Sequence, residues 1–431
     1  MAETWRAAAG AAAAAPPTGV AAVQRRTVST LAVSQALGGV GVTSGIAVAT
    51  LLAEDILGSA RLAGLAQTSQ VLGAALAAFL LARVMAARGR RLGLALGYGI
   101  GALGALACVL SGMWASFPLL LLGTMAIGSA TAANSQARYA ATDLAVPSGR
   151  ARSLALVMWA TTIGAVLGPN LAGPGAAVAR ALGIPALTGP FVFTVLAVGA
   201  ATTWLLIRLR PDPLLLAREL ASTRGEVSMG TVSLRHVFSV LRAYPRAGAA
   251  MLAIAVAHAV MVSVMVMTPL HMHHGGAELR VIGFVISVHV LGMFAFSPVV
   301  GWLTDRAGRA PVLAAGSVVL LSSVVLAGRA PEGQSAGLTL GLFLLGLGWS
   351  LTVIASSALL VDAVPLEERP GVQGGSDLVM GLFAAGGGAL AGVVVAEWGY
   401  GVLNAAAGVL ALVVLAAAVL ARDAGVQLEH G

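Results

Sequence analysis

The 431-residue sequence contains no lysine, a single cysteine and few charged side chains. Charged residues make up 10% of the chain, whereas soluble globular proteins carry roughly 25%. So little charge cannot cover a water-facing surface, which excludes a soluble globular protein. Without lysine the chain cannot form the phosphate loop of ATPases, so ATP does not drive it directly. Cys108 lies in an apolar run and has no partner for an internal disulfide.

Long apolar runs dominate what is present. The chain is 58% hydrophobic, with a mean hydropathy of +0.92. A membrane β-barrel would alternate polar and apolar residues in segments of about ten, but residues 188–207 and 402–420 are unbroken apolar runs. Runs of this length cross a bilayer as α-helices, and the 55 glycines fit a bundle whose helices pack closely. We therefore predict an all-α, multi-pass membrane protein.

Twelve membrane-spanning helices are expected from the apolar stretches between polar breaks. They cover residues 29–52, 62–85, 92–111, 117–139, 154–179, 188–207, 249–271, 281–303, 311–327, 337–361, 371–395 and 402–421. These stretches predict one six-helix bundle over 28–209 and a second over 247–422. The other segments are predicted to be a disordered N-terminal tail (1–27), a central loop (210–246) and a C-terminal tail (423–431). Within the central loop, residues 234–241 are predicted to form a short amphipathic helix on the membrane surface.

Arginine placement predicts how the chain is oriented. Arginines follow the second, fourth, eighth and tenth expected helices: Arg88, Arg90, Arg91, Arg150, Arg152, Arg306, Arg309 and Arg369. The loops on the opposite side are poorer in arginine, and most of their arginines lie near acidic residues. Because positive loops remain inside the cell, both termini and the central loop are expected in the cytoplasm. The chain is expected in the inner or plasma membrane.

The two halves repeat at a fixed offset. Gly89 and Arg90 recur as Gly308 and Arg309, and the DLAVP segment at 143–147 recurs as DAVP at 362–365. Each second copy begins 219 residues after the first (89 to 308, 143 to 362). Two unrelated motifs with one offset predict duplicated, pseudo-symmetric halves with a transport path between them.

One loop resembles a family signature. Residues 301–309 read GWLTDRAGR and match the G-x-L-x-D-R-x-G-R loop of the major facilitator superfamily. The resemblance implies a secondary transporter that works by alternating access, with this loop as a gating latch formed by Asp305, Arg306, Gly308 and Arg309. In the first-half copy Ala86 replaces the aspartate, so the latch is expected to depend on the second half. The alternative interpretation is a positive loop with no gating role.

A second motif lies in the helix expected over 154–179. Its glycines and prolines are Gly164, Gly168, Pro169, Gly173 and Pro174. This segment resembles the superfamily's antiporter motif, which is common in exporters. A purely structural role is the alternative, because glycine and proline bend helices and permit close packing.

Histidine and methionine gather in one region: all but one of the 7 histidines lie between His236 and His289. His258, Met261 and Met265 share one helical face, and His289 and Met293 share another. Imidazole and thioether are soft ligands suited to Cu(I). The alternatives are that the methionines fill gaps in a core, that a histidine only bonds another helix, and a different role such as proton relay.

The segment from Met261 to Pro298 is similar to bacterial copper importers of the same superfamily. The resemblance implies a metal path over Met261, Met265, His289 and Met293, with His258 beside it. Copper-type uptake is therefore the leading prediction for the substrate, and proton-coupled efflux of small amphiphilic organic compounds is the alternative.

An acidic residue within a helix suggests that transport is coupled to protonation. Asp377 is the clearest such residue, and a carboxylate inside the membrane is a candidate for protonation. A capping or latch role is the alternative, because Asp377 lies about two turns from the cytoplasmic end of its helix. Arg138 is predicted to lie in the same cytoplasmic layer. No catalytic motif is present, so we expect no enzyme activity and no cofactor. The expected partners are membrane lipid and a small-molecule or ion substrate, without nucleic acid, and we expect a monomer.

Overall fold

The computed structural model describes residues 18–58, 62, 65–223, 233–277, 279–333 and 336–426, and these residues are helical apart from short turns. The first half contains α2 (Thr18–Leu57), α3 (Leu65–Arg88), α4 (Arg90–Met113), α5 (Phe117–Ala140), η2 (Pro147–Gly149), α6 (Arg150–Trp159), α7 (Thr161–Asn170), α8 (Ala172–Ala181), η3 (Ala186–Thr188) and α9 (Gly189–Arg208). The connection contains α10 (Pro213–Ser222) and α11 (Leu234–Ala243). The second half contains α12 (Pro245–His274), α13 (Leu279–Phe294), α14 (Ser297–Ala307), α15 (Arg309–Gly328), α16 (Ala336–Ala363) and α17 (Arg369–Val426).

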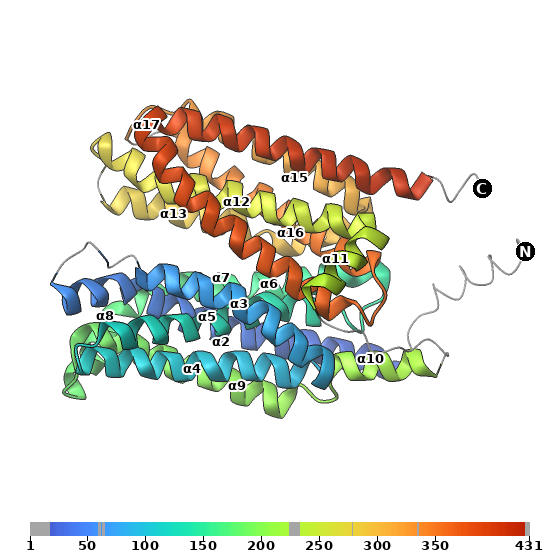
Figure 1. The fold of residues 1–431 in the computed structure, drawn as a ribbon, viewed down its shortest axis with the longest axis horizontal. Coiled ribbons are helices and arrows are strands. Elements are labelled where there is room, and N and C mark those ends of the chain that lie inside the picture. The colour runs from blue at the N-terminus through green and yellow to red at the C-terminus, as the bar shows by residue number, and fades with distance from the viewer. Residues whose placement is uncertain are drawn as a thin grey trace, which may run out of the picture.

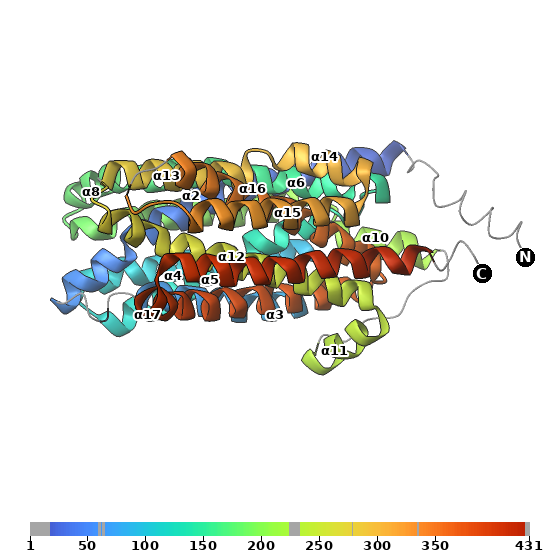
Figure 2. The same ribbon diagram turned by 90° about the horizontal axis from the view of Figure 1, so that it is seen from above.

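The two halves form two bundles that lie side by side, the first blue to green and the second yellow to red (Figure 1). The chain enters α2 and leaves α17 at the same end of the molecule, which we call the terminal end. Figure 2 places α10 and α11 at this end as well.

Eleven helical stretches among the described residues are long and apolar enough to cross a membrane. The last covers 53 residues, 369–421. A straight helix of that length would measure about 80 Å, far more than the roughly 30 Å of a bilayer core. Gly399 breaks it with a φ of 83°, and Figure 1 shows α17 turning back on itself there. The predicted helices at 371–395 and 402–421 are these two arms.

Two expected helices are interrupted. The helix predicted over 154–179 is divided into α6, α7 and α8, and the one over 281–303 is divided before Ser297 and Pro298 into α13 and α14. Pro298 accounts for the second break, because proline has no backbone N–H and disfavours helical geometry in the residue before it.

The predicted tails and loop need correction. Residues 18–27, assigned to a disordered tail, belong to α2, and Gln24 Nε2 donates to the Ala141 carbonyl at 2.7 Å. α17 extends to Val426, and the central loop contains α10 as well as the expected amphipathic helix α11. Asp212 Oδ1 starts α10 by accepting from the amides of Leu214 and Leu215. Residues 1–17, 224–232 and 427–431 lie outside the described residues.

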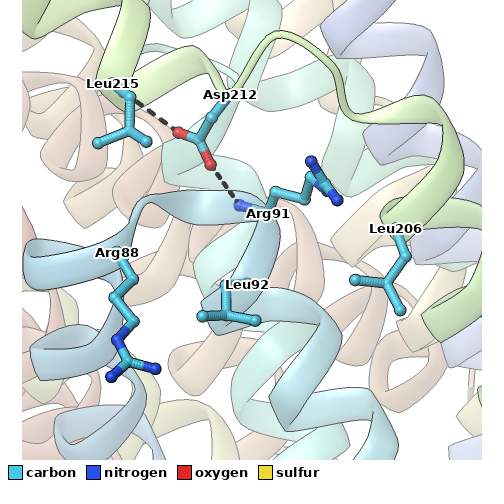
Figure 3. Close-up of a pocket in the computed structure, with 6 residues that line it drawn as sticks. All are labelled: Arg88, Arg91, Leu92, Leu206, Asp212 and Leu215. Atoms are coloured by element: carbon cyan, nitrogen blue, oxygen red, sulfur yellow. Dashed lines mark hydrogen bonds between the residues drawn. The ribbon is translucent and has the colours of Figure 1, made fainter.

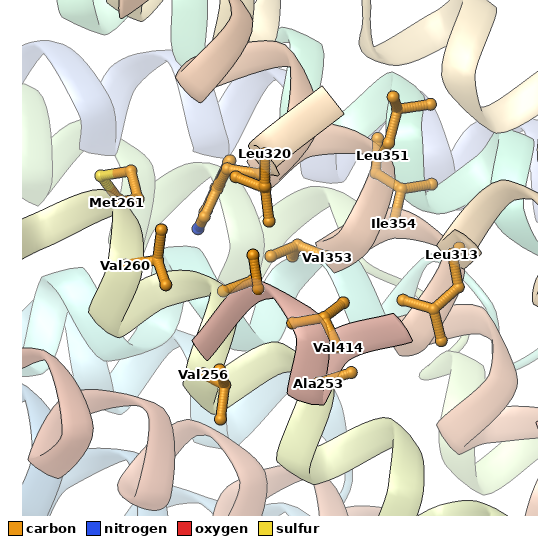
Figure 4. Close-up of a cluster of buried hydrophobic side chains, with 14 of the residues drawn as sticks. Ala253, Val256, Val260, Met261, Leu313, Leu320, Leu351, Val353, Ile354 and Val414 are labelled. Carbon is orange, nitrogen blue, oxygen red and sulfur yellow. The ribbon is translucent and has the colours of Figure 1, made fainter. Parts of the chain in front are cut away.

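Each half has its own apolar core. In the second half, α12 packs against α16 and α17, and the cluster in Figure 4 includes Val256, Val260, Leu320 and Val353. This core continues across the interface into α6 of the first half, where Gly301 of α14 packs against Ala155. A side chain at 301 would collide with that helix.

Candidate functional site

The second-half latch joins α14 to α6 at the terminal end. Asp305 Oδ2 accepts from the amide of Arg152 at 2.9 Å, and Oδ1 accepts from the amide of Ala151 at 3.2 Å. The first amides of a helix have no partner within it and attract a negative charge. Asp305 therefore caps a helix of the opposite half, while Arg309 Nη1 lies 3.3 Å from its Oδ1. Asp305 therefore has an arginine of its own half beside it and backbone partners in α6 of the first half.

Asp362 extends this latch into a network across the halves. Arg309 Nε donates to Asp362 Oδ2 at 2.9 Å, and Arg150 of the first half donates to Oδ1. Arg309 also donates to the carbonyl of Pro147. Arg306 is exposed, with its guanidinium 5.4 Å from the ring centre of Trp302, and it forms no ion pair with a described residue. Of the predicted latch residues, Asp305 and Arg309 make the cross-half contacts.

Gly308 shapes the latch through its backbone. Its φ of 94° and that of Gly89, 86°, lie in the left-handed region that favours glycine. Each of these glycines lies between two helices. The next residue, Arg90 or Arg309, is the first residue of the following helix.

The first half has a buried counterpart of this network. Arg90 binds Asp143 through Nε at 2.8 Å and through Nη2 at 3.2 Å. The same Nη2 donates across the interface to Gln373 Oε1 at 2.7 Å. Both side chains of the ion pair are 0% exposed. Arg90–Asp143 and Arg309–Asp362 have the same sequence separation, 53 residues, as duplicated halves require.

A buried ion pair joins the halves deeper in the molecule. Arg138 Nη2 of α5 donates to Asp377 Oδ1 of α17 at 2.6 Å, and Gln136 Nε2 donates to Oδ2 at 2.7 Å. Arg138 also donates to the hydroxyl of Tyr139 at 3.2 Å. The two charged side chains are 6% and 2% exposed. Asp377 lies about 12 Å along its helix from Arg369, so this pair closes the interface well inside the bundle.

An aromatic group lies in the second half. Trp349 Nε1 of α16 donates to His258 Nδ1 of α12 at 2.9 Å. The ring of Phe294 in α13 packs edge-on to Trp349, with centroids 5.7 Å apart. His258 and Phe294 are only partly buried. Three helices therefore bring flat rings together, a group that sequence spacing could not reveal because its members are far apart in the chain.

The residues of the predicted metal path lie in or against the buried core of the second half. His289 is 1% exposed, and its Nδ1 lies 2.9 Å from the carbonyl of Leu342 in α16, a contact in which the ring nitrogen donates. Met261 and Met293 are buried in the apolar core, and Met265 packs against it; Figure 4 shows Met261 beside Val260. Among the described residues, no group of three His, Cys, Asp or Glu side chains could hold a metal ion. The three methionines fit core packing, whereas His289 Nε2 is buried without a hydrogen-bond partner among the described residues.

The motif of glycines and prolines packs the interrupted helix against α2. Thr43 Oγ1 donates to the carbonyl of Gly164 at 2.8 Å, and a side chain at Gly164 or Gly168 would collide with α2. A side chain at Gly173 would meet nothing within 4 Å. Pro174 is exposed in α8, and the side chain of Pro169 lies outside the described part of the structure. Two of the glycines thus have a packing role.

A small pocket of about 240 Å³ lies beside the first-half loop, lined by Arg88, Arg91, Leu92, Leu206, Asp212 and Leu215. Figure 3 shows the carboxylate of Asp212 accepting from the backbone amides of Arg91 and Leu215. The guanidinium groups of Arg88 and Arg91 point in different directions there, so they do not form one convergent anion site.

Comparisons with known proteins agree with this architecture. The family model described as Major Facilitator Superfamily matches residues 31–278 and again residues 250–429. The chain belongs to the major facilitator superfamily. It is a membrane-spanning secondary transporter, like the other members of that family.

Several known proteins are similar to this chain over most of their length. The Bacillus subtilis proteins YdeG and YddS, both described as uncharacterized MFS-type transporters, are each 36% identical. YdeG aligns over 400 residues, 92% of each chain, and YddS over 394 residues, 91% of this chain and 89% of YddS. The riboflavin transporter RfnT of Brucella anthropi is 27% identical over 361 residues, 84% of this chain and 86% of RfnT. None of these three names refers to copper, so they do not support the predicted likeness to copper importers.

Solved structures share the fold. The human organic anion transporter MFSD10 superposes with a TM-score of 0.74 at 17% identity, covering 92% of this chain and 99% of its own. The fucose:proton symporter FucP of E. coli superposes with a TM-score of 0.63 at 16% identity, covering 91% and 98%. At such identities the likeness establishes the fold alone.

Proposed function

We propose that this transporter moves a small organic solute by alternating access and couples its movement to protonation of Asp377. The observation that carries the proposal is the buried ion pair between Arg138 and Asp377, which joins the two halves. Alternating access opens one end of the path by separating the halves at that end. Opening the terminal end therefore has to separate this pair.

The energetics of the pair explain the coupling. Removing one partner from a buried ion pair costs about 3–5 kcal/mol, because the other charge remains uncompensated. A proton on Asp377 removes one of the two charges, so less free energy is needed to separate the halves. Arg138 then needs a new partner, which the opened, hydrated path supplies. Proton binding and opening of the terminal end are linked in this way.

The aromatic group of His258, Phe294 and Trp349 supports an organic solute with a flat ring. Aromatic rings bind such solutes by stacking or edge contacts. The family resemblance to the riboflavin transporter RfnT fits this proposal. Soft-metal uptake is not carried forward, because none of the three relatives' names refers to a metal and Met261 and Met293 pack in the apolar core.

The orientation remains the one expected from the arginines. With the terminal end in the cytoplasm, the networks around Asp305, Arg90 and Asp377 together close the cytoplasmic side. The path in this conformation then leads toward the outer face. The transporter is proposed to act as a monomer in the cell membrane.

The test is transport by purified protein in proteoliposomes, with riboflavin as the first solute and Cu(I) and a panel of planar organic acids beside it. We expect one organic solute to accumulate in response to a pH gradient. Asp377→Asn should abolish the response to the gradient, and Trp349→Leu should lower solute affinity. Trp302→Leu is the matched control, because Trp302 is exposed on α14. Transport of Cu(I) alone, or a full response to the gradient in Asp377→Asn, would contradict the proposal.

A further inference from the structure

The amphipathic helix α11 has an apolar face that only partly packs on the bundle. Val237 and Val240 are buried in the core of the second half. On an adjacent face Leu234 is 48% exposed and Phe238 is 66% exposed. These two residues are four apart and lie on the same side of the helix. A face of this kind outside the membrane-crossing helices needs an occupant.

Positive charge borders this face. Arg235 and Arg242 are seven residues apart, two helical turns, and at about 100° per residue they lie next to the side that carries Leu234 and Phe238. Arg246 follows just beyond the helix. All three arginines are exposed, and none forms an ion pair with a described residue. The exposed side of α11 therefore combines an apolar face with a positively charged edge.

The position of α11 matches the surface of a bilayer. α12 begins at Pro245, directly after α11, so α11 lies at the level where a membrane-crossing helix starts. Figure 2 shows α11 standing out to the side of the bundle at the terminal end. Helices with Phe or Leu on one face and arginine beside it bind in the headgroup layer and favour anionic lipid.

We propose that α11 is a docking surface for anionic phospholipid headgroups. Leu234 and Phe238 insert at the boundary of the acyl chains, while Arg235, Arg242 and Arg246 bind the phosphates. The helix is also tied to the gate. His236 Nε2 donates to Glu368 Oε2 at 2.7 Å, and Val237 packs on Gly375. Both contacts reach the start of α17, the helix that carries Gln373 and Asp377.

The test places a spin label on full-length protein in nanodiscs. In a Cys108→Ser background, Phe238→Cys reports the apolar side, and Ser239→Cys is the matched control on the neighbouring exposed side. The discs contain phosphatidylcholine alone or with an equal amount of phosphatidylglycerol. Accessibility to oxygen and to a nickel chelate reports the depth of the label.

In anionic discs the label at 238 should be more accessible to oxygen than to nickel, and the label at 239 should show the reverse. Phosphatidylglycerol should raise the oxygen-to-nickel ratio at 238 about threefold, and Arg235→Gln with Arg242→Gln should remove that rise. Equal nickel access at 238 and 239 would overturn the proposal. So would a lipid effect that survives the double substitution, or shielding of position 238 from both reagents, which would indicate a protein on this face.

Discussion

The two predicted latches of this transporter share one repeated sequence pattern but are built differently. In the second half, the ion pair of Arg309 and Asp362 is 16% and 26% exposed, and the signature carboxylate Asp305 caps α6. In the first half, Ala86 takes the place of the aspartate, and Arg90 and Asp143 are fully buried, with Gln373 bound from the other half. The first half thus keeps a contact with the second half without the signature aspartate. Its ion pair is buried within the first half, and the hydrogen bond across the interface runs from Arg90 to the side-chain amide oxygen of Gln373.

The comparison teaches that the two latches should respond differently to substitution. Buried ion pairs are costly to break, whereas exposed pairs contribute about 0–1 kcal/mol and are screened by salt. The first-half network should therefore govern folding, and the second-half network should govern the balance between conformations.

The largest effect is expected from Arg90→Gln. It leaves Asp143 buried without its cation, which should destabilise the fold by about 3–5 kcal/mol. The apparent Tm in detergent, followed by tryptophan fluorescence, should fall well below that of wild type. The double variant Arg90→Met with Asp143→Leu should recover much of this loss, because it removes both charges. An Arg90→Gln protein as stable as Arg309→Gln would contradict the claim that the first-half network matters more for folding than the second-half network.

Asp305→Ala should have an intermediate effect, on transport rather than folding. It removes two contacts to the amides of α6, worth about 1–2 kcal/mol, and such a change alters a two-state balance by about 5–30-fold. The transport rate in proteoliposomes should fall by a factor in that range while the apparent Tm changes little. A wild-type rate in Asp305→Ala would remove its gating role.

Arg309→Gln should act more weakly. Its ion pair with Asp362 is partly exposed, so its contribution to stability should be about 1 kcal/mol or less. The difference between Arg309→Gln and wild type in apparent Tm should shrink further as salt is raised. A large loss that is insensitive to salt would show that the second latch is as structural as the first.

The smallest expected effect is that of lipid charge on the gate. The contacts of α11 with α17 exist in the conformation that is closed at the terminal end, so lipid bound to α11 should favour that conformation. Labels at Glu219→Cys on α10, which packs against α4 of the first half, and at Ala307→Cys in the second half should show about a threefold larger short-distance population in phosphatidylglycerol than in phosphatidylcholine. Identical distance distributions in the two lipids would show that lipid bound to α11 does not affect the gate.

Much of the fold could be predicted, because the apolar runs and the 219-residue offset are local or periodic signals. The break at Gly399 lies in the predicted gap between residues 395 and 402, whereas the interruption at Ser297 and the helix α10 were missed. The segment Asp212-Pro213 was a usable signal for α10, since aspartate followed by proline starts helices. The repeated DLAVP and DAVP segments could also have identified Asp143 and Asp362 as partners of the latch arginines.

The site was harder to predict, since its contacts join distant parts of the chain. The bond from Arg138 to Asp377 spans 239 residues, and the one from Trp349 to His258 spans 91. The spacing of His289 and Met293 suggested a metal path, but it could not reveal that His289 Nδ1 meets the carbonyl of Leu342. Helical periodicity shows which residues share a face, and tertiary packing decides what that face meets.

The most direct test of the account is the pH dependence of opening at the terminal end. The charge of Asp377 stabilises the closed conformation, so that stabilisation is present at high pH and is lost as Asp377 takes up a proton. Pulsed EPR distances between labels at Glu219→Cys and Ala307→Cys, in the Cys108→Ser background, should shift from short to long as pH falls. In Asp377→Asn the distribution should already be shifted toward long distances and should not change with pH. The same pH response in Asp377→Asn as in the wild-type pair would contradict the coupling role of Asp377.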